Sequence, residues 1–203
     1  MTMSMFSQTI KTDNKLIINH GDITLYLTKD TCTMVSKHVL KFSDFLKLDN
    51  ERDNRWFRDK YKGKYYKEAY YRTGYDIGHL TPSHITSYDN KLNHKSFSLF
   101  NAAPQLATFN RGRWAQLESD VEDLIAEGKQ DVVIITGVIY DPKNKKFMGK
   151  SRIPIPSAYY KILFINGTTK CWIGSNINGL ITITTLKDLN ELFKLNGMNL
   201  VIQ

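Results

Sequence analysis

The chain has 203 residues, of which 41% are hydrophobic and 24% charged, which excludes a disordered protein and allows one domain with a full core. No apolar run reaches the roughly 18 residues that a membrane-spanning helix needs. The formal net charge of +8 favours a polyanionic partner, either nucleic acid or an anionic membrane surface. Because no amphipathic run accompanies this charge, we expect nucleic acid and no membrane.

Residues 1–15 show no apolar segment typical of a signal peptide, which predicts an intracellular protein with a loosely ordered start. No repeat or low-complexity linker divides the chain, so we expect a single domain over residues 1–203. Cys32 and Cys171 are predicted to be free, buried thiols, with one disulfide as the alternative.

The N-terminal region is typical of β structure. Residues 16–28 (LIINHGDITLYLT) predict two short strands around a turn at His20-Gly21-Asp22, and residues 33–42 predict another strand. His20 and His38 fall in these strands, where a lone histidine is usually a structural residue.

The composition changes between residues 50 and 72, where basic and aromatic side chains alternate. Cations can neutralise phosphates and rings can stack on exposed bases, so this segment suits a nucleic-acid-binding face. The alternative is a solvated loop whose rings cover the edge of the core. The residues concerned are Arg52, Arg55, Arg58, Lys60, Lys62, Lys64, Lys67 and Arg72, with Trp56, Phe57, Tyr61, Tyr65, Tyr66, Tyr70 and Tyr71.

The next region predicts the order strand, strand, helix. Residues 75–82 should be extended, residues 83–96 a connecting loop with at most a helical turn, and residues 97–102 a buried strand. From about Phe109 a helix is predicted to run to Glu127 and to end at Gly128.

The C-terminal region predicts more strands and one helix. A core strand at 131–140 is followed by a stiff connector, Ile153–Pro156, and by strands 158–165 and 169–174, paired across Asn166-Gly167. A strand at 180–184 and a helix at 186–195, capped by Thr185 and ending near Gly197, complete the chain. The fold class is therefore α+β, with a mixed or antiparallel central sheet flanked by helices.

Three residues in the strand–strand–helix region suit the hydrolysis of a phosphodiester, which needs an activated water and a cation. His79 supplies a base, Asn110 a neutral oxygen ligand for Mg²⁺, and Glu118 a carboxylate two helical turns further on. Positions 110, 114 and 118 drift by only about 80° around a helix, so they share one side. Each residue alone is more often structural, and the hypothesis depends on their order and spacing.

Other catalytic motifs are poorly matched. Gly149-Lys150-Ser151 resembles the end of a P-loop, but Asn144 stands where that motif requires glycine. No Cys/His spacing fits zinc, and no G-x-S-x-G sequence is present.

These blocks resemble the DNA/RNA non-specific endonucleases, a family that includes endonuclease G and secreted bacterial nucleases. The family signature Asp-Arg-Gly-His, followed by a short spacer and Pro, appears as Asp76-Ile77-Gly78-His79-Leu80-Thr81-Pro82. The second block appears as Asn101-Ala102-Ala103-Pro104-Gln105, then Asn110, Trp114 and Leu117-Glu118. The likeness continues through residues 136–140 and 155–161 and covers most of the chain from about Asn54 to Leu195.

The resemblance implies a ββα-metal finger, also called a His-Me finger, and Mg²⁺-dependent hydrolysis of DNA and RNA to 5′-phosphate and 3′-hydroxyl ends. Mn²⁺ would be a substitute for Mg²⁺, and family members are often homodimers. The implied catalytic residues are His79 as general base, Glu118 as the residue orienting water on the cation, and Arg55 at the phosphate, with Arg52 or Arg58 as alternatives. Asn110 would be the only direct protein ligand of the metal.

Further positions follow from the same resemblance. Asp76 and Gly78 would shape the turn that holds His79, with Trp114 nearby. Substrate contacts are expected from Arg72, Gln105, Arg111 and Arg113.

One departure from the family pattern concerns Ile77, which stands where the signature has arginine. The lost positive charge would slow turnover, alter the choice of substrate, or be replaced by Arg72, Arg111 or Arg113. The competing hypothesis is a catalytically impaired nucleic-acid-binding protein that uses the same basic face.

Overall fold

The computed structural model describes residues 8–13, 16–28, 32–49, 51–59 and 67–203. Loose order was expected over residues 1–15, and residues 1–7 and 14–15 lie outside the described part. Within it, strand β1 (Ile10–Thr12) pairs with the C-terminal strand β13 (Leu200–Ile202), so the expectation is wrong for this short segment. Residues 60–66 of the basic and aromatic segment also lie outside the described residues.

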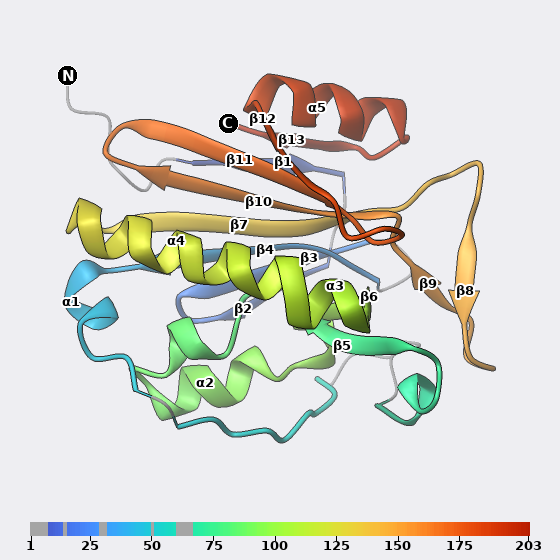
Figure 1. The fold of residues 1–203 in the computed structure, drawn as a ribbon, viewed down its shortest axis with the longest axis horizontal. Coiled ribbons are helices and arrows are strands. Elements are labelled where there is room, and N and C mark those ends of the chain that lie inside the picture. The colour runs from blue at the N-terminus through green and yellow to red at the C-terminus, as the bar shows by residue number, and fades with distance from the viewer. Residues whose placement is uncertain (1–7, 14–15, 29–31, 50, 60–66) are drawn as a thin grey trace.

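The centre of the protein is a seven-stranded sheet in which all neighbouring strands are antiparallel (Figure 1). This confirms the predicted α+β class. From one edge to the other the strands are β12 (Ile181–Thr184), β11 (Thr168–Ser175), β10 (Ala158–Ile165), β7 (Val132–Ile139), β4 (Thr33–Leu40), β3 (Ile23–Leu27) and β2 (Ile17–His20).

The central strand β7 shows why the sheet has two covered faces. Every residue of β7 is buried, and successive side chains point to opposite faces. Val132 and Ile134 pack with helix α4 (Ala115–Gly128), whereas Val133 and Ile135 pack with helix α5 (Leu186–Leu195). Figure 1 shows the two helices on opposite sides of the sheet. A strand buried on both faces reads as a continuous apolar run.

Two predicted boundaries in the connecting region are wrong. Residues 83–96 contain a 3₁₀ turn (His84–Thr86) and helix α2 (Asn90–Ser96), which begins where the Asp89 carboxylate accepts a hydrogen bond of 2.7 Å from Leu92 N. Residues 99–101 form another 3₁₀ turn, and the strand that follows, β6, spans Ala102–Leu106. The run of apolar residues predicted burial correctly but not the backbone conformation.

The predicted strand–strand–helix unit is present (Figure 1). Strand β5 (Tyr75–His79) pairs antiparallel with β6, and His79 lies opposite Ala102. After β6 come a short helix α3 (Ala107–Phe109), a π turn (Asn110–Trp114) and α4. The helix ends at Gly128 as predicted, although Lys129 and not Gly128 takes the left-handed conformation, with φ 49°. Close packing explains the glycine at position 128, because a Cβ atom there would lie 2.6 Å from Ile165 Cδ1.

The C-terminal predictions are largely confirmed. Asn166 and Gly167 both have positive φ, 53° and 70°, as the two-residue turn between β10 and β11 requires. Thr185 Oγ1 accepts a hydrogen bond from Asp188 N and caps α5. The expected connector at 153–156 instead contributes strand β9 (Ile153–Ile155), which pairs with β8 (Lys146–Met148).

Three smaller observations complete the fold. A short helix, α1 (Phe42–Phe45), follows β4. Both cysteines are free and buried, as predicted. Among the helices that the structure describes, none combines the length and apolar character needed to cross a membrane.

The pH dependence of stability can be tested at His38, which is fully buried in β4 with its Nδ1 unpaired. Burial, reinforced by the charge of Lys161, lowers the pKa of His38 to about 3. The unfolded chain takes up a proton near the ordinary pKa of 6.5, whereas the folded chain does not, so stability falls as the pH drops through that range. Between pH 7.5 and 5, His38 should cost about 2 kcal/mol that a His38→Gln variant does not lose. Urea unfolding of both proteins at the two pH values measures this difference, and equal losses would contradict it.

Candidate active site

The carboxylate of Asp76, on β5, connects the hairpin to the following helix. It accepts hydrogen bonds from Asn110 Nδ2 at 2.9 Å, from Arg111 Nε at 2.9 Å and from Arg111 Nη2 at 2.7 Å. Burial alone would raise the pKa of Asp76, but the hydrogen bonds from Arg111 and Asn110 lower it below its ordinary value. Asp76 is therefore ionised at neutral pH, and it fixes the first turn of the helix against the strand.

This contact determines which way the Asn110 amide points. A carboxylate only accepts hydrogen bonds, so the NH₂ group must face Asp76 and the carbonyl Oδ1 must point away from it. No hydrogen bond to Oδ1 is formed by the residues that the structure describes. An oriented amide oxygen with free lone pairs is the ligand type that hard divalent cations prefer.

The π turn places Asn110 relative to Glu118. The helical backbone is interrupted at Gly112, whose φ and ψ are −112° and −106°. A π turn contains more residues per turn than an α-helix, so it rotates the chain less per residue and offsets the drift expected between positions 110 and 118. Such bulges are frequent at functional sites.

Glu118 is held by a buried lysine that sequence reasoning missed. Lys161 Nζ, on β10, lies 3.7 Å from Glu118 Oε1, donates a hydrogen bond of 3.0 Å to Thr136 Oγ1, and stands 5.1 Å from the Trp114 ring centre. Burial raises the pKa of Glu118, and the charge of Lys161 opposes that rise. A single lysine inside a core strand was the available signal, because lysine is rarely buried without a partner.

His79 sits at the end of β5 between two aromatic rings. Its ring centre is 4.4 Å from that of Trp56, with planes 36° apart, and 4.9 Å from that of Phe97, which it meets edge-on. Nε2 is buried without a hydrogen-bond partner. Burial, with a contribution from the positive charge of Arg52, lowers the pKa of His79 to about 3. The imidazole is thus unprotonated at neutral pH.

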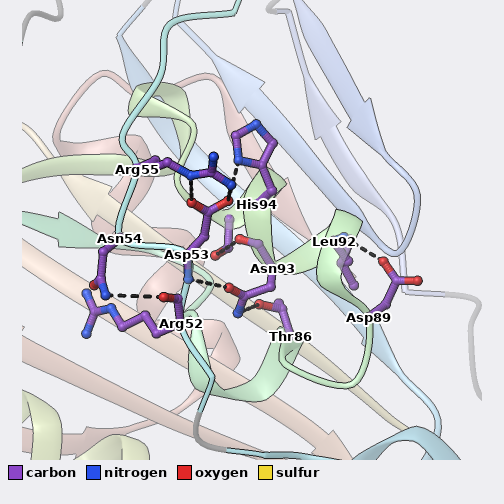
Figure 2. A network of polar contacts seen from close by, with 10 residues as sticks. Arg52, Asp53, Asn54, Arg55, Thr86, Asp89, Leu92, Asn93 and His94 are labelled. Atoms are coloured by element: carbon purple, nitrogen blue, oxygen red, sulfur yellow. Dashed lines mark hydrogen bonds and ion pairs between the residues drawn. The ribbon is translucent and has the colours of Figure 1, made fainter.

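Arg55 and Arg52, two of the arginines considered for the phosphate, differ in their contacts near His79. Figure 2 shows the Arg55 guanidinium bound to the Asp53 carboxylate, which also contacts His94 Nδ1 at 2.6 Å. The hydrogen bond from Arg55, followed by that from His94, lowers the pKa of Asp53 to about 2. Arg52 instead places its guanidinium carbon 5.3 Å from the centre of the Phe97 ring, and Phe97 packs on His79. Of the alternatives that the sequence left open, the geometry therefore favours Arg52 over Arg55.

Gln105 was expected to contact substrate, and the structure corrects this. Its side chain is 0% exposed, because it packs directly beneath Gly78 on the neighbouring strand. A Cβ on Gly78 would lie 2.3 Å from Gln105 Oε1, which explains why a glycine precedes His79. Gln105 supports the hairpin from inside and does not face a substrate.

The three remaining arginines are all exposed, although they differ in their contacts. Arg111 is paired with Asp76, and Arg72 has its guanidinium 5.1 Å from the ring centre of Tyr71. An open cavity of about 800 Å³ is lined by Arg72, Asp76 and Arg111 among others. Arg113 lies on the π turn and has an exposed side chain.

The residues proposed from sequence thus gather in three contact groups around one hairpin and helix. Asp76 joins Asn110 and Arg111, Lys161 joins Glu118 to Trp114, and Trp56 joins the strap 51–59 to His79. No group of three or more His, Cys, Asp or Glu able to hold a metal occurs among the described residues. An ion at this site would therefore depend on a neutral amide oxygen, one carboxylate and water, and the oriented Oδ1 of Asn110 fits that requirement.

A β-hairpin that ends in histidine, followed by a helix that carries an amide and a carboxylate, defines the ββα class of active-site unit. The chain belongs to the DNA/RNA non-specific endonuclease family, whose family model matches residues 3–198.

Curated relatives and a solved structure agree with this membership. The mitochondrial nuclease of Saccharomyces cerevisiae is 30% identical over 137 residues, 59% of this chain and 41% of that protein. Human mitochondrial endonuclease G is 26% identical over 133 residues, 59% of this chain and 44% of that protein. The nuclease of Serratia marcescens is 34% identical over 96 residues, 46% of this chain and 35% of that protein. The chain therefore spans less than half the length of these relatives.

The fold is also shared with an EndoG chain from the crystal structure of an EndoG/EndoGI complex. The TM-score is 0.74 at 18% sequence identity, and the match covers 90% of this chain and 84% of that chain. The shared region includes most of the sheet, so the fold predicted from the resemblance is confirmed.

The contact between Trp56 and His79 leads to a testable pKa change. Replacing Trp56 with Ala should let water reach the imidazole, so the pKa of His79 should rise from about 3 toward the ordinary value of 6.5. Trp56→Phe should keep the pKa low, because a ring still covers the histidine. NMR titration of the histidine ring signals measures both variants, with His38, which is buried elsewhere, as an internal control. An unchanged His79 pKa in Trp56→Ala would show that Trp56 does not cause the shift.

Proposed function

We propose that the protein is a Mg²⁺-dependent endonuclease that hydrolyses DNA and RNA with little sequence preference. The observation that carries this proposal is the Asp76–Asn110 hydrogen bond, which turns Asn110 Oδ1 away from Asp76 and so leaves it available to an ion, in the strand pair and helix that also carry His79. Membership of the endonuclease family and the names of the relatives support it.

His79 is the general base in this proposal. Its ring is neutral at physiological pH, and a ring nitrogen would accept the proton of the water that attacks the phosphorus in line. The packing of Trp56 and Phe97 fixes the ring, so the base needs little reorganisation before the reaction. Hydrolysis leaves a 5′-phosphate and a 3′-hydroxyl.

Asn110 Oδ1 would hold Mg²⁺ directly, and Glu118 would hold it through water. When bound, the ion stabilises negative charge on the phosphate and on the leaving oxygen. Mn²⁺, which accepts the same oxygen ligands, would replace it. Lys161 keeps the Glu118 carboxylate oriented and favours its charged form.

The nucleic acid would lie along the arginines near the site. Arg52 stands beside the pair of rings that hold His79, and Arg111 and Arg72 line the adjoining cavity. Ile77 stands where the family has a positively charged arginine. Arg111 would partly replace that charge, because its guanidinium lies beside Asp76, the residue that precedes Ile77 on β5. Arg113 adds a further exposed cation on the same turn.

The competing function is binding without cleavage, and Ile77 is the observation that favours it. The decisive experiment incubates supercoiled plasmid with wild-type protein in Mg²⁺, with wild-type protein in EDTA, and with His79→Ala in Mg²⁺. We expect nicking only in the first reaction, because each of the other two lacks the cation or the base. A gel-shift assay under the same conditions shows whether DNA is bound. Binding without nicking in all three reactions would establish the competing function.

The effect of Ile77 can be measured directly by changing it to Arg. A cation at this position would add a charge-assisted contact to the scissile phosphate, so the cleavage rate should rise by about 10- to 150-fold. Ile77→Met, which is uncharged and similar in volume, separates the effect of charge from that of packing. An unchanged or lower rate in Ile77→Arg would contradict this prediction.

A further inference from the structure

Tyr71 is an exposed aromatic residue beside the proposed active site. Its relative exposure is 74%, whereas the preceding Tyr70 is 7% exposed and belongs to the core. The guanidinium carbon of Arg72 lies 5.1 Å from the Tyr71 ring centre, which is the distance of a cation–π contact. A ring exposed to this degree contributes little to packing, and its face remains open to a ligand.

The backbone around Tyr71 is held firmly in place. Tyr71 N donates to Glu68 O at 3.2 Å, and both the backbone N and the side-chain Oγ1 of Thr73 donate to Tyr70 O, at 3.3 and 2.8 Å. Arg72 has a φ of 55°, in the left-handed region that residues other than glycine rarely adopt. Such conformations are concentrated at functional sites. Together these contacts bury Tyr70 and turn Tyr71 and Arg72 outward.

The open cavity of about 800 Å³ links this ring to the site. The residues that line this cavity include Tyr71 and Arg72, and also Asp76, Ile77 and Arg111. Tyr71 and Asp76 are five positions apart in the sequence, so their Cα atoms are at most about 18 Å apart. A short run of nucleotides would therefore reach from the Asp76–Arg111 pair to the Tyr71 ring, with Arg72 available for an intervening phosphate.

We propose that Tyr71, supported by Arg72, is a stacking site for an unpaired base, so that the protein binds single-stranded nucleic acid in preference to duplex at this cavity. This inference rests on the proposed nuclease function. In a duplex both faces of a base are covered by its neighbours, and only phosphates are offered to Arg72 and Arg111. In a single strand the base is free to stack on tyrosine, and such stacking does not depend on sequence.

The test measures binding of a fluorescent single-stranded oligonucleotide, and of a hairpin duplex of the same length, to the full chain in EDTA. Tyr71→Ala should weaken binding of the single strand by about 5- to 150-fold and leave binding of the duplex unchanged. Tyr71→Phe should bind like wild type, because it keeps the ring. Phe147→Ala is the matched control, since Phe147 is also exposed and has Arg152 4.3 Å from its ring centre, and Phe147 lines a different pocket.

Three outcomes would overturn the inference. An unchanged single-strand affinity in Tyr71→Ala would show that no base stacks there, and equal losses for both substrates would show that the substitution disturbs the surface generally. The same loss in Phe147→Ala would point to a nonspecific effect of removing exposed rings. If Tyr71→Ala binds normally while the wild type nicks plasmid, only the stacking site is rejected. If the wild type neither binds nor nicks, the nuclease function is rejected as well.

Discussion

The hydrogen bond between Asn110 and Asp76 is the contact on which the rest of the site depends. It joins the helix to the first strand of the hairpin and leaves only one orientation for the Asn110 amide. Arg111 donates two more hydrogen bonds to the Asp76 carboxylate. These bonds lower the pKa of Asp76, so that it stays ionised, and they hold the first helical turn against the strand. The large sheet and α4 provide the rigid support for this contact, since α4 is packed on strands β7 and β10 through the core.

Burial controls the chemistry of the two ionisable residues beside this contact. Burial, with a contribution from the charge of Arg52, lowers the pKa of His79 and keeps the ring neutral, which is the protonation state that a base needs. Burial raises the pKa of Glu118, which favours the uncharged form of the carboxyl group. The positive charge of Lys161, which is buried in the sheet, opposes this rise. Burying an ammonium group costs free energy unless the group is paired. The contact of Lys161 with Glu118 on α4 offsets part of this cost.

The sequence predicted those features that depend on local pattern. Alternation and turn residues located the hairpin at Asn166-Gly167, and the cap at Thr185 located α5. Features that depend on distant contacts could not be predicted. Lys161 lies 43 positions from Glu118 in the sequence (161 − 118), and nothing local shows that they meet. The same holds for Trp56 on His79, for the burial of Gln105 under Gly78, and for the π turn, whose geometry follows from Gly112 and the contact to Asp76.

The central claim is that Asn110 Oδ1 is oriented by Asp76 to bind the catalytic cation. The most direct measurement is an anomalous difference map from a crystal of this protein soaked in Mn²⁺. The account predicts a peak at direct coordination distance from Asn110 Oδ1, a spacing of about 2.1 Å for Mg²⁺, with Nδ2 still bonded to Asp76. A peak on the Asp76 carboxylate, or an occupied ion site with no contact to Asn110, would contradict it.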